Sequence, residues 1–314
     1  MIIDDIELAA QILRSGEIVA FPTETVYGLG GCALNQDACL KIYQAKTRPS
    51  NNPLIVHINS VEQAFIIGEF NEKAKYLTKF WPGPLTIVTK VKSDNLAQAV
   101  LAGLDTFALR MPQNDTALEL ISKSGTAIAA PSANISGYIS ATSADEVDKD
   151  FLGKIPVLKG KVTYGIESTI ISLYDDKCRI LRHGFITQEL LEKELGEKFF
   201  VPNTKAHIEA PGMMMKHYSP KTKVRLNVTK FNFSNELVLS FGAVNNIPEN
   251  IHNLNLSPDS DLIEACANLY KYLRVMDLEA HNNPNISCIA VTPIPNYGIG
   301  VAINDRLKRA AAVD

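Results

Sequence analysis

Polar and charged side chains that a folded core does not require stand at several points where an apolar run of the sequence ends. They are Thr25, Lys46 with Arg48, His57, Arg110, Ser132 with Asn134, Ser168, and Arg182 with His183. Ligands of α/β sheets bind just outside the carboxyl ends of the strands. Guanidinium groups bind phosphate and carboxylate oxygens through paired hydrogen bonds. Gathered at one edge of a sheet, these residues would suit a polyanion and a small polar substrate.

Each of these residues also has a purely structural interpretation. A lone arginine at the end of a strand is often part of a surface ion pair, and a lone histidine within a strand is often a hydrogen-bonded core residue. Ser132 and Asn134 could stabilise a turn. The combination of several cations with hydroxyl groups therefore favours a binding site more than any single residue does.

The first of these groups lies in the stretch from Ile18 to Gly31. Its apolar start, Ile18 to Phe21, is typical of a buried strand, which Pro22 ends. Hydroxyl and carboxylate side chains follow, and then the glycines Gly28, Gly30 and Gly31. We expect these glycines to form a loop in which the backbone approaches a ligand closely or takes positive φ.

Several common catalytic motifs are missing from the sequence. It contains no G-x-x-x-x-G-K-[ST] loop, no G-x-G-x-x-G after a strand, no G-x-S-x-G elbow and no H-E-x-x-H. The histidines do not have metal-ligand spacing, and the five cysteines form no C-x-x-C pair. These absences argue against a serine hydrolase, a structural zinc site and a disulfide framework, and they favour a reducing compartment.

Composition predicts a globular protein rather than a membrane or nucleic-acid-coating protein. Of 314 residues, 46% are hydrophobic and 21% are charged, and the net charge is -3. A net negative charge argues against binding nucleic acid by charge alone. We find no signal peptide and no apolar stretch long enough to cross a bilayer, so we expect a cytoplasmic protein.

Strand and helix patterns alternate along the chain, which is typical of an α/β fold. Asp4 is expected to cap a first helix, and a late hairpin after Glu167 makes the predicted sheet mixed. The length favours two domains. We predict a catalytic domain over 1–200, a linker over 201–223, and a small α/β domain over 224–314. In the last, strands are expected at Val224–Val228, Leu237–Phe241 and Cys288–Thr292, with a helix around Leu262–Met276.

Six segments, taken together, resemble one known family. They are Phe21-Pro-Thr-Glu-Thr-Val-Tyr-Gly-Leu, Lys46-x-Arg48 with Asn52-Pro-Leu, Trp81-Pro-Gly-Pro-Leu-Thr, Leu109-Arg-Met-Pro, Pro131-Ser-Ala-Asn-x-Ser-Gly and Glu167-Ser-Thr-Ile. The chain is similar to the YrdC-type threonylcarbamoyl-adenylate synthases. Pro211-Gly-Met-x-x-Lys-His-Tyr-Ser-Pro220 and the tail resemble the longer, two-domain form.

The resemblance implies a fold and a reaction. The expected fold is a twisted, open, mixed α/β sheet with a concave cleft, followed by a small Rossmann-like α/β domain. The expected substrates are L-threonine, bicarbonate or carbon dioxide, and ATP, and the products are threonylcarbamoyl-AMP and pyrophosphate. A partner complex would then transfer the threonylcarbamoyl group to a tRNA adenosine. Mg²⁺ would accompany ATP, and no protein ligand for it can be identified from the sequence.

The resemblance also implies roles for individual residues. Threonine would be held by Thr25, His57, Arg110, Ser132 and Ser168. ATP would be held by Arg48, Asn52, Thr106, Ala130 through its backbone, Ser140, Arg182 and Tyr218. Lys46, Arg48 and Asn134 would act in catalysis by facing phosphate or bicarbonate and orienting the reacting groups. Our own hypothesis is that the C-terminal domain anchors the linker as a lid, because Lys216-His-Tyr218 lies between the two domains in the sequence.

Three alternatives stay open at this point. The first is a double-stranded RNA or tRNA-binding module without adenylating activity, although the acidic balance and the few aromatic residues weigh against it and favour at most weak direct tRNA binding. The second is a carbamoyltransferase of hydrogenase maturation, whose zinc-type cysteine pairs this sequence lacks. The third is a purely structural protein, which does not explain so many polar strand ends.

Overall fold

The computed structural model describes residues 1–92, 95–175, 177–202, 217–231, 235–244, 247–248 and 251–312. These residues form two compact units. The second unit combines the described residues from 217 onward with two earlier segments, Gly137–Ser140 and Tyr164–Ile166. The first unit contains the rest. Most of the linker predicted over 201–223 lies outside the described residues.

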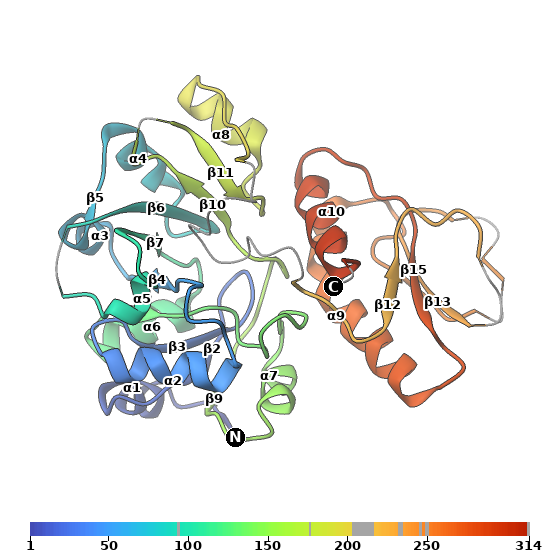
Figure 1. The fold of residues 1–314 in the computed structure, drawn as a ribbon, viewed down its shortest axis with the longest axis horizontal. Helices are drawn as coiled ribbons and strands as arrows, with labels where there is room; N and C mark the ends of the chain where they lie inside the picture. The colour runs from blue at the N-terminus through green and yellow to red at the C-terminus, as the bar shows by residue number, and fades with distance from the viewer. Residues whose placement is uncertain are drawn as a thin grey trace. The chain divides into compact units, whose positions relative to one another are not determined.

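A mixed sheet forms the first unit. Within the described ranges it has eleven strands in the order β1-β9-β2-β3-β8-β4-β7-β6-β10-β11, and β5 pairs with β6 (Figure 1). The strands are β1 (Ile2–Ile3), β2 (Val19–Phe21), β3 (Gly28–Cys32), β4 (Ile55–His57), β5 (Gly68–Glu69), β6 (Leu85–Val91), β7 (Thr106–Arg110), β8 (Ile128–Ala129), β9 (Val157–Leu158), β10 (Thr169–Ser172) and β11 (Arg179–Arg182). The predicted hairpin is the antiparallel pair β10–β11.

Helices accompany this sheet along the chain. They are α1 (Ile6–Arg14), α2 (Gln36–Lys46), α3 (Val61–Ile67), α4 (Glu72–Leu77), the 3₁₀ helix η1 (Thr78–Phe80), α5 (Gln98–Leu101), α6 (Asp115–Ser124), α7 (Ala144–Asp150) and α8 (Gln188–Leu195). Helix α1 begins after Asp5, whose carboxylate accepts from Glu7 N and Leu8 N. The expected start at Asp4 was therefore wrong by one residue, because Asp5 takes the extended conformation of an N-cap.

The two faces of the large sheet have different coverings. Helices α1 and α6 pack together, and their apolar residues join Val19, Phe21 and Ile128 on one face. On the other face, Ala20, Leu29, Val56, Ile87 and Leu109 pack with residues of α2, α3 and α4 in the largest core. A separate small core is formed by apolar residues of β4, β6, β7, β10 and β11, namely Ile55, Val88, Ala108, Ile170 and Leu181.

The predicted glycine loop is a strand. Residues Gly28–Cys32 form β3, which pairs antiparallel with β2 and with β8. None of its glycines has positive φ. A Cβ on Gly30 would lie 2.6 Å from the Phe21 ring and 2.7 Å from Ile128 Cγ2. Glycine is needed at position 30 because the side chains of Phe21 and Ile128 occupy the space that a Cβ would fill. The prediction of a glycine loop was therefore wrong.

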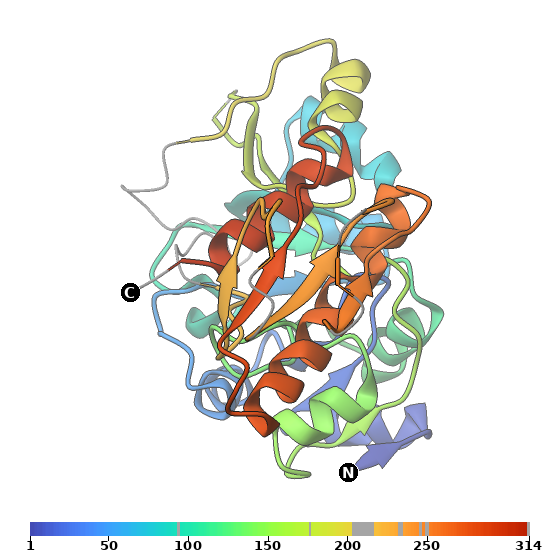
Figure 2. The same cartoon turned by 90° about the vertical axis from the view of Figure 1, so that its right-hand side faces the viewer.

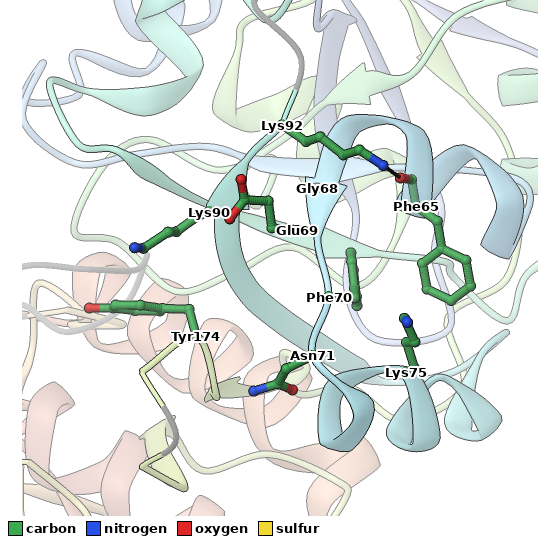
Figure 3. A pocket seen from close by; sticks show the side chains of 9 residues that line it. All are labelled: Phe65, Gly68, Glu69, Phe70, Asn71, Lys75, Lys90, Lys92 and Tyr174. Carbon is green, nitrogen blue, oxygen red and sulfur yellow. Dashed lines mark hydrogen bonds between the residues drawn. The ribbon is translucent and has the colours of Figure 1, made fainter.

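A parallel sheet forms the core of the second unit. Its strands are β12 (Lys223–Arg225), β13 (Glu236–Ser240), β14 (Asn253–Asn255) and β15 (Cys288–Val291), in the order β12-β15-β13-β14. All three pairings are parallel. Helix α9 (Leu262–Asn282) packs against β13, β15 and α10 (Ile299–Ala310), as Figure 2 shows. The mixed sheet and the small parallel sheet confirm the predicted α/β class.

Strand β14 was not predicted, because Asn253-Leu254-Asn255 is short and mostly polar. In the part of the chain that the structure describes, no helix combines the length and the apolar character that a membrane span requires.

Candidate active site

The pairing register places His57 and Arg110 side by side. Each is the last residue of its strand, and they are partners in the parallel pair β4–β7. Thr106 begins β7 and shares the face of Arg110, because side chains alternate along a strand. At a rise of about 3.3 Å per residue, Thr106 lies roughly 13 Å along the strand from Arg110. This sheet face could therefore contact an extended ligand at two points.

Arg110 is bound by the turn that follows β2. Its Nη1 donates to Thr25 Oγ1 at 2.9 Å, and its Nη2 lies 2.6 Å from Glu24 Oε2. The side chains of Arg110 and Glu24 are only 4% and 2% exposed. Thr23 fixes the turn, because its hydroxyl donates to Val26 O at 2.6 Å. The structure thus brings the predicted residues Thr25 and Arg110 together, and it adds Glu24.

His57 is buried and uncharged at neutral pH. Burial, reinforced by the nearby charge of Arg110, lowers its pKa to about 3. The His57 Nδ1 lies 3.2 Å from Ile55 O, and the ring meets Phe21 edge to face at 5.9 Å. A neutral imidazole in this place can orient a polar substrate without adding a second positive charge beside Arg110.

Ser168 and Arg182 contact each other in the β10–β11 hairpin, where Ser168 precedes β10 and Arg182 ends β11. Arg182 Nη2 donates to Ser168 Oγ at 3.1 Å and Nε donates to Ser168 O at 3.0 Å. The Ser168 hydroxyl also lies 2.7 Å from Thr86 Oγ1. All three residues are buried. Thr86 was not predicted as a site residue, although it ends the Trp81-Pro-Gly-Pro-Leu-Thr segment on which the family resemblance partly rests.

Lys46 contacts the predicted Ser132–Asn134 segment. Its Nζ donates to Ser132 O at 2.6 Å and also to Asn134 O. The side chain is almost fully buried, and burial, reinforced by the charge of Arg48, holds its pKa well below the usual lysine range. The two motifs that the sequence suggests for catalysis therefore lie against each other.

Arg48 belongs to a separate cluster next to Lys46. Thr47 between them has φ 52°, so the chain leaves α2 in a left-handed turn. Arg48 Nη2 donates to Asn52 Oδ1 at 2.6 Å and to Pro53 O at 2.9 Å. The two predicted ATP residues Arg48 and Asn52 are thus hydrogen-bonded to each other.

The remaining predicted ATP residues are distributed over both units. Ala130 is buried after β8, and its backbone N–H donates to Ile55 O at 2.8 Å, so a ligand contact through its backbone would use the carbonyl. Ser140 and Tyr218 belong to the second unit. Across the described ranges, no group of three or more His, Cys, Asp or Glu residues is placed to hold a metal ion.

Comparison with known proteins identifies the relatives of this chain. The family model Sua5_yciO_yrdC, described as "Telomere recombination", matches residues 11–184. That match spans more than half of the chain. The chain belongs to the Sua5/YciO/YrdC family. A second model, "Threonylcarbamoyl-AMP synthase, C-terminal domain", matches residues 186–312, which places the chain with the two-domain Sua5 proteins.

Relatives of this Sua5-type chain match it almost from end to end. A threonylcarbamoyl-AMP synthase of Bacillus subtilis is 40% identical over 324 residues, which cover 96% of this chain and 92% of the relative. One of Pyrococcus abyssi is 39% identical over 329 residues, covering 98% and 94%. The crystal structure of P. abyssi Sua5 complexed with L-threonine has a TM-score of 0.89 at 36% identity, over 99% of this chain and 97% of that one.

Proposed function

We propose that this Sua5-type chain is a threonylcarbamoyl-AMP synthase that uses L-threonine, bicarbonate or carbon dioxide, and ATP. The observation that carries the proposal is the near-complete match to two synthases of that name, over more than 90% of each protein. The buried group of Thr25, Arg110 and His57 supports it, because an amino acid needs a cation for its carboxylate and neutral polar groups beside it.

The reaction needs no protein nucleophile. The threonine amine attacks carbon dioxide, a C–N bond forms, and the amine proton is released to give an N-carboxylate. An oxygen of that carboxylate then attacks the α-phosphorus of ATP. The new O–P bond replaces the bond to the β-phosphate oxygen, and pyrophosphate leaves. The enzyme has to hold two anions against each other and offset their repulsion, which is orientational and electrostatic catalysis.

The candidate site residues divide between these tasks. Arg110 would bind the threonine carboxylate, with Thr25, His57, Ser132 and Ser168 around the amino acid. ATP would be contacted by Arg48, Asn52, Thr106, Ala130, Ser140, Arg182 and Tyr218. Lys46, Arg48 and Asn134 would face the reacting phosphate and carboxylate groups. The Lys46 contacts with Ser132 O and Asn134 O support this arrangement, since they join the two catalytic motifs.

Mg²⁺ would enter with the nucleotide, held by its phosphate oxygens, and would supply charge neutralisation. We assign no protein ligand to it. The product would pass to a tRNA-modifying transfer complex, and we place the whole reaction in the cytoplasm.

The test is pyrophosphate release from ATP and bicarbonate with Mg²⁺, measured with L-threonine, with L-serine and without an amino acid. We expect release that depends on threonine and is much weaker with serine. A folded protein that releases none, but binds RNA in a strongly salt-dependent way, would favour the RNA-binding module instead.

A further inference from the structure

Three residues of α9 lie on one face of that helix and contact segments outside the parallel sheet. Tyr270, Arg274 and Asp277 follow each other at intervals of four and three residues, which places them one turn apart. We call them the α9 stripe. Their partners are Tyr138–Ser140, which lies in sequence within the catalytic domain, and residues 218–222, which precede β12.

Arg274 fixes the backbone next to Ser140. Its Nε donates to Ser140 O at 3.2 Å and its Nη2 donates to Ile139 O. The guanidinium also lies over the Tyr138 ring, with Cζ 4.9 Å from the ring centre. One planar group therefore holds two consecutive carbonyls and the preceding side chain, which a flexible ammonium group does poorly.

Asp277 joins both segments through one carboxylate. Its Oδ2 accepts from the Tyr138 hydroxyl at 2.8 Å, and its Oδ1 accepts from both the N–H and the hydroxyl of Thr222, each at 2.8 Å. The side chain is buried. Ser219 N donates to Gly137 O at 2.9 Å, which links the same segments a second time.

Tyr270 holds Tyr218. The two rings stack at 5.7 Å with an angle of 20° between their planes. Arg306 of α10 lies over the Tyr218 ring at 5.0 Å, and the Tyr218 side chain is almost fully buried. Tyr218 itself has φ 59°, a conformation that its surroundings have to maintain.

We propose that the α9 stripe positions Ser140 and Tyr218 for ATP, so that the C-terminal domain sets nucleotide affinity. The inference rests on the proposed function, which assigns both residues to ATP. Tyr270, Arg274 and Asp277 are positioning residues, since they act through the segments they hold. The contacts described for Tyr270, Arg274 and Asp277 are with the segments that carry Ser140 and Tyr218, so losing them should act on the KM for ATP rather than on the KM for threonine.

The kinetic test replaces Arg274 with methionine in the full-length protein. Arg274→Met loses charge-assisted hydrogen bonds, and we expect the KM for ATP to rise by about tenfold or more while the KM for threonine changes little. Lys271→Met is the matched control, because Lys271 is an exposed cation on the same helix. Arg274→Lys should fall between the parent and Arg274→Met. An ATP KM for Arg274→Met equal to that of Lys271→Met would overturn the inference.

A second measurement does not depend on activity. Hydrogen exchange of the full-length chain should quicken over residues 137–141 in Arg274→Met and at the Thr222 amide in Asp277→Ala, but not in Lys271→Met. Unchanged exchange would show that the stripe does not hold these segments. If the parent protein releases no pyrophosphate, the proposed function fails, whereas exchange still decides whether the α9 stripe acts as described.

Discussion

At the scale of single residues, the buried pair of Glu24 and Arg110 links stability to the proposed substrate site. Removing one partner of a buried ion pair leaves an uncompensated charge, which costs about 3–5 kcal/mol. Both side chains are buried, with 2.6 Å between Arg110 Nη2 and Glu24 Oε2, and Arg110 belongs to the proposed threonine site. A substitution of Arg110 should therefore act on stability as well as on the proposed binding of threonine.

This pair gives a prediction that separates the two effects. Arg110→Met should lower the free energy of unfolding by about 3–5 kcal/mol, because the Glu24 carboxylate stays buried without its cation. The double variant Arg110→Met with Glu24→Gln should regain most of that stability and still require far more threonine than the parent. Urea unfolding and threonine titrations measure both. A double variant with the parent's KM for threonine would remove Arg110 from the substrate site.

His57 predicts a pH dependence of stability. The pKa of His57 is about 3 in the folded protein and 6.5 in the unfolded chain. Between these pH values the unfolded chain binds a proton at His57 and the folded protein does not. The resulting stability is fully present above about pH 6.5 and is lost as the pH falls towards 3. In His57→Gln, the unfolding free energy should fall less steeply in this window, by up to about 1.4 kcal/mol per pH unit. Parallel curves would mean that His57 titrates normally.

At the scale of elements, β3 depends on glycine because of its neighbours. We expect Gly30→Ala to destabilise the fold by about 1–3 kcal/mol, the usual cost of overpacking, because its Cβ would meet Phe21 and Ile128. Gly28→Ala is the control, since its nearest contact would be 3.3 Å rather than 2.6 Å. Thermal unfolding compares the two, and equal midpoints would contradict this explanation of the strand.

The elements also show what the sequence could predict. His57 and Arg110 were identifiable because each ends an apolar run, and their meeting follows from strand pairing. Strand β3 was missed because three glycines resemble a loop, and only the positions of Phe21 and Ile128 explain them. The hold of α9 on residues 138–140 was beyond prediction, since Arg274 lies 134 residues after Ser140 and such contacts leave no local pattern.

At the scale of the whole molecule, the residues proposed for different tasks belong to different units. The first contains the groups proposed for threonine and the Lys46–Asn134 contact, and the second contains α9 with the segments it holds. This division agrees with family models that match the two parts separately. The boundaries proposed from sequence, 1–200, 201–223 and 224–314, remain a proposal, because residues 203–216 lie outside the described part of the chain.

The most direct test of the account is to identify the product. The protein is incubated with ATP, L-threonine, Mg²⁺ and bicarbonate labelled with carbon-13, and the mixture is analysed by mass spectrometry. The account predicts threonylcarbamoyl-AMP that is one mass unit heavier than the product from unlabelled bicarbonate, formed together with pyrophosphate. Turnover of ATP that yields only ADP, or AMP without labelled threonylcarbamoyl-AMP, would contradict it.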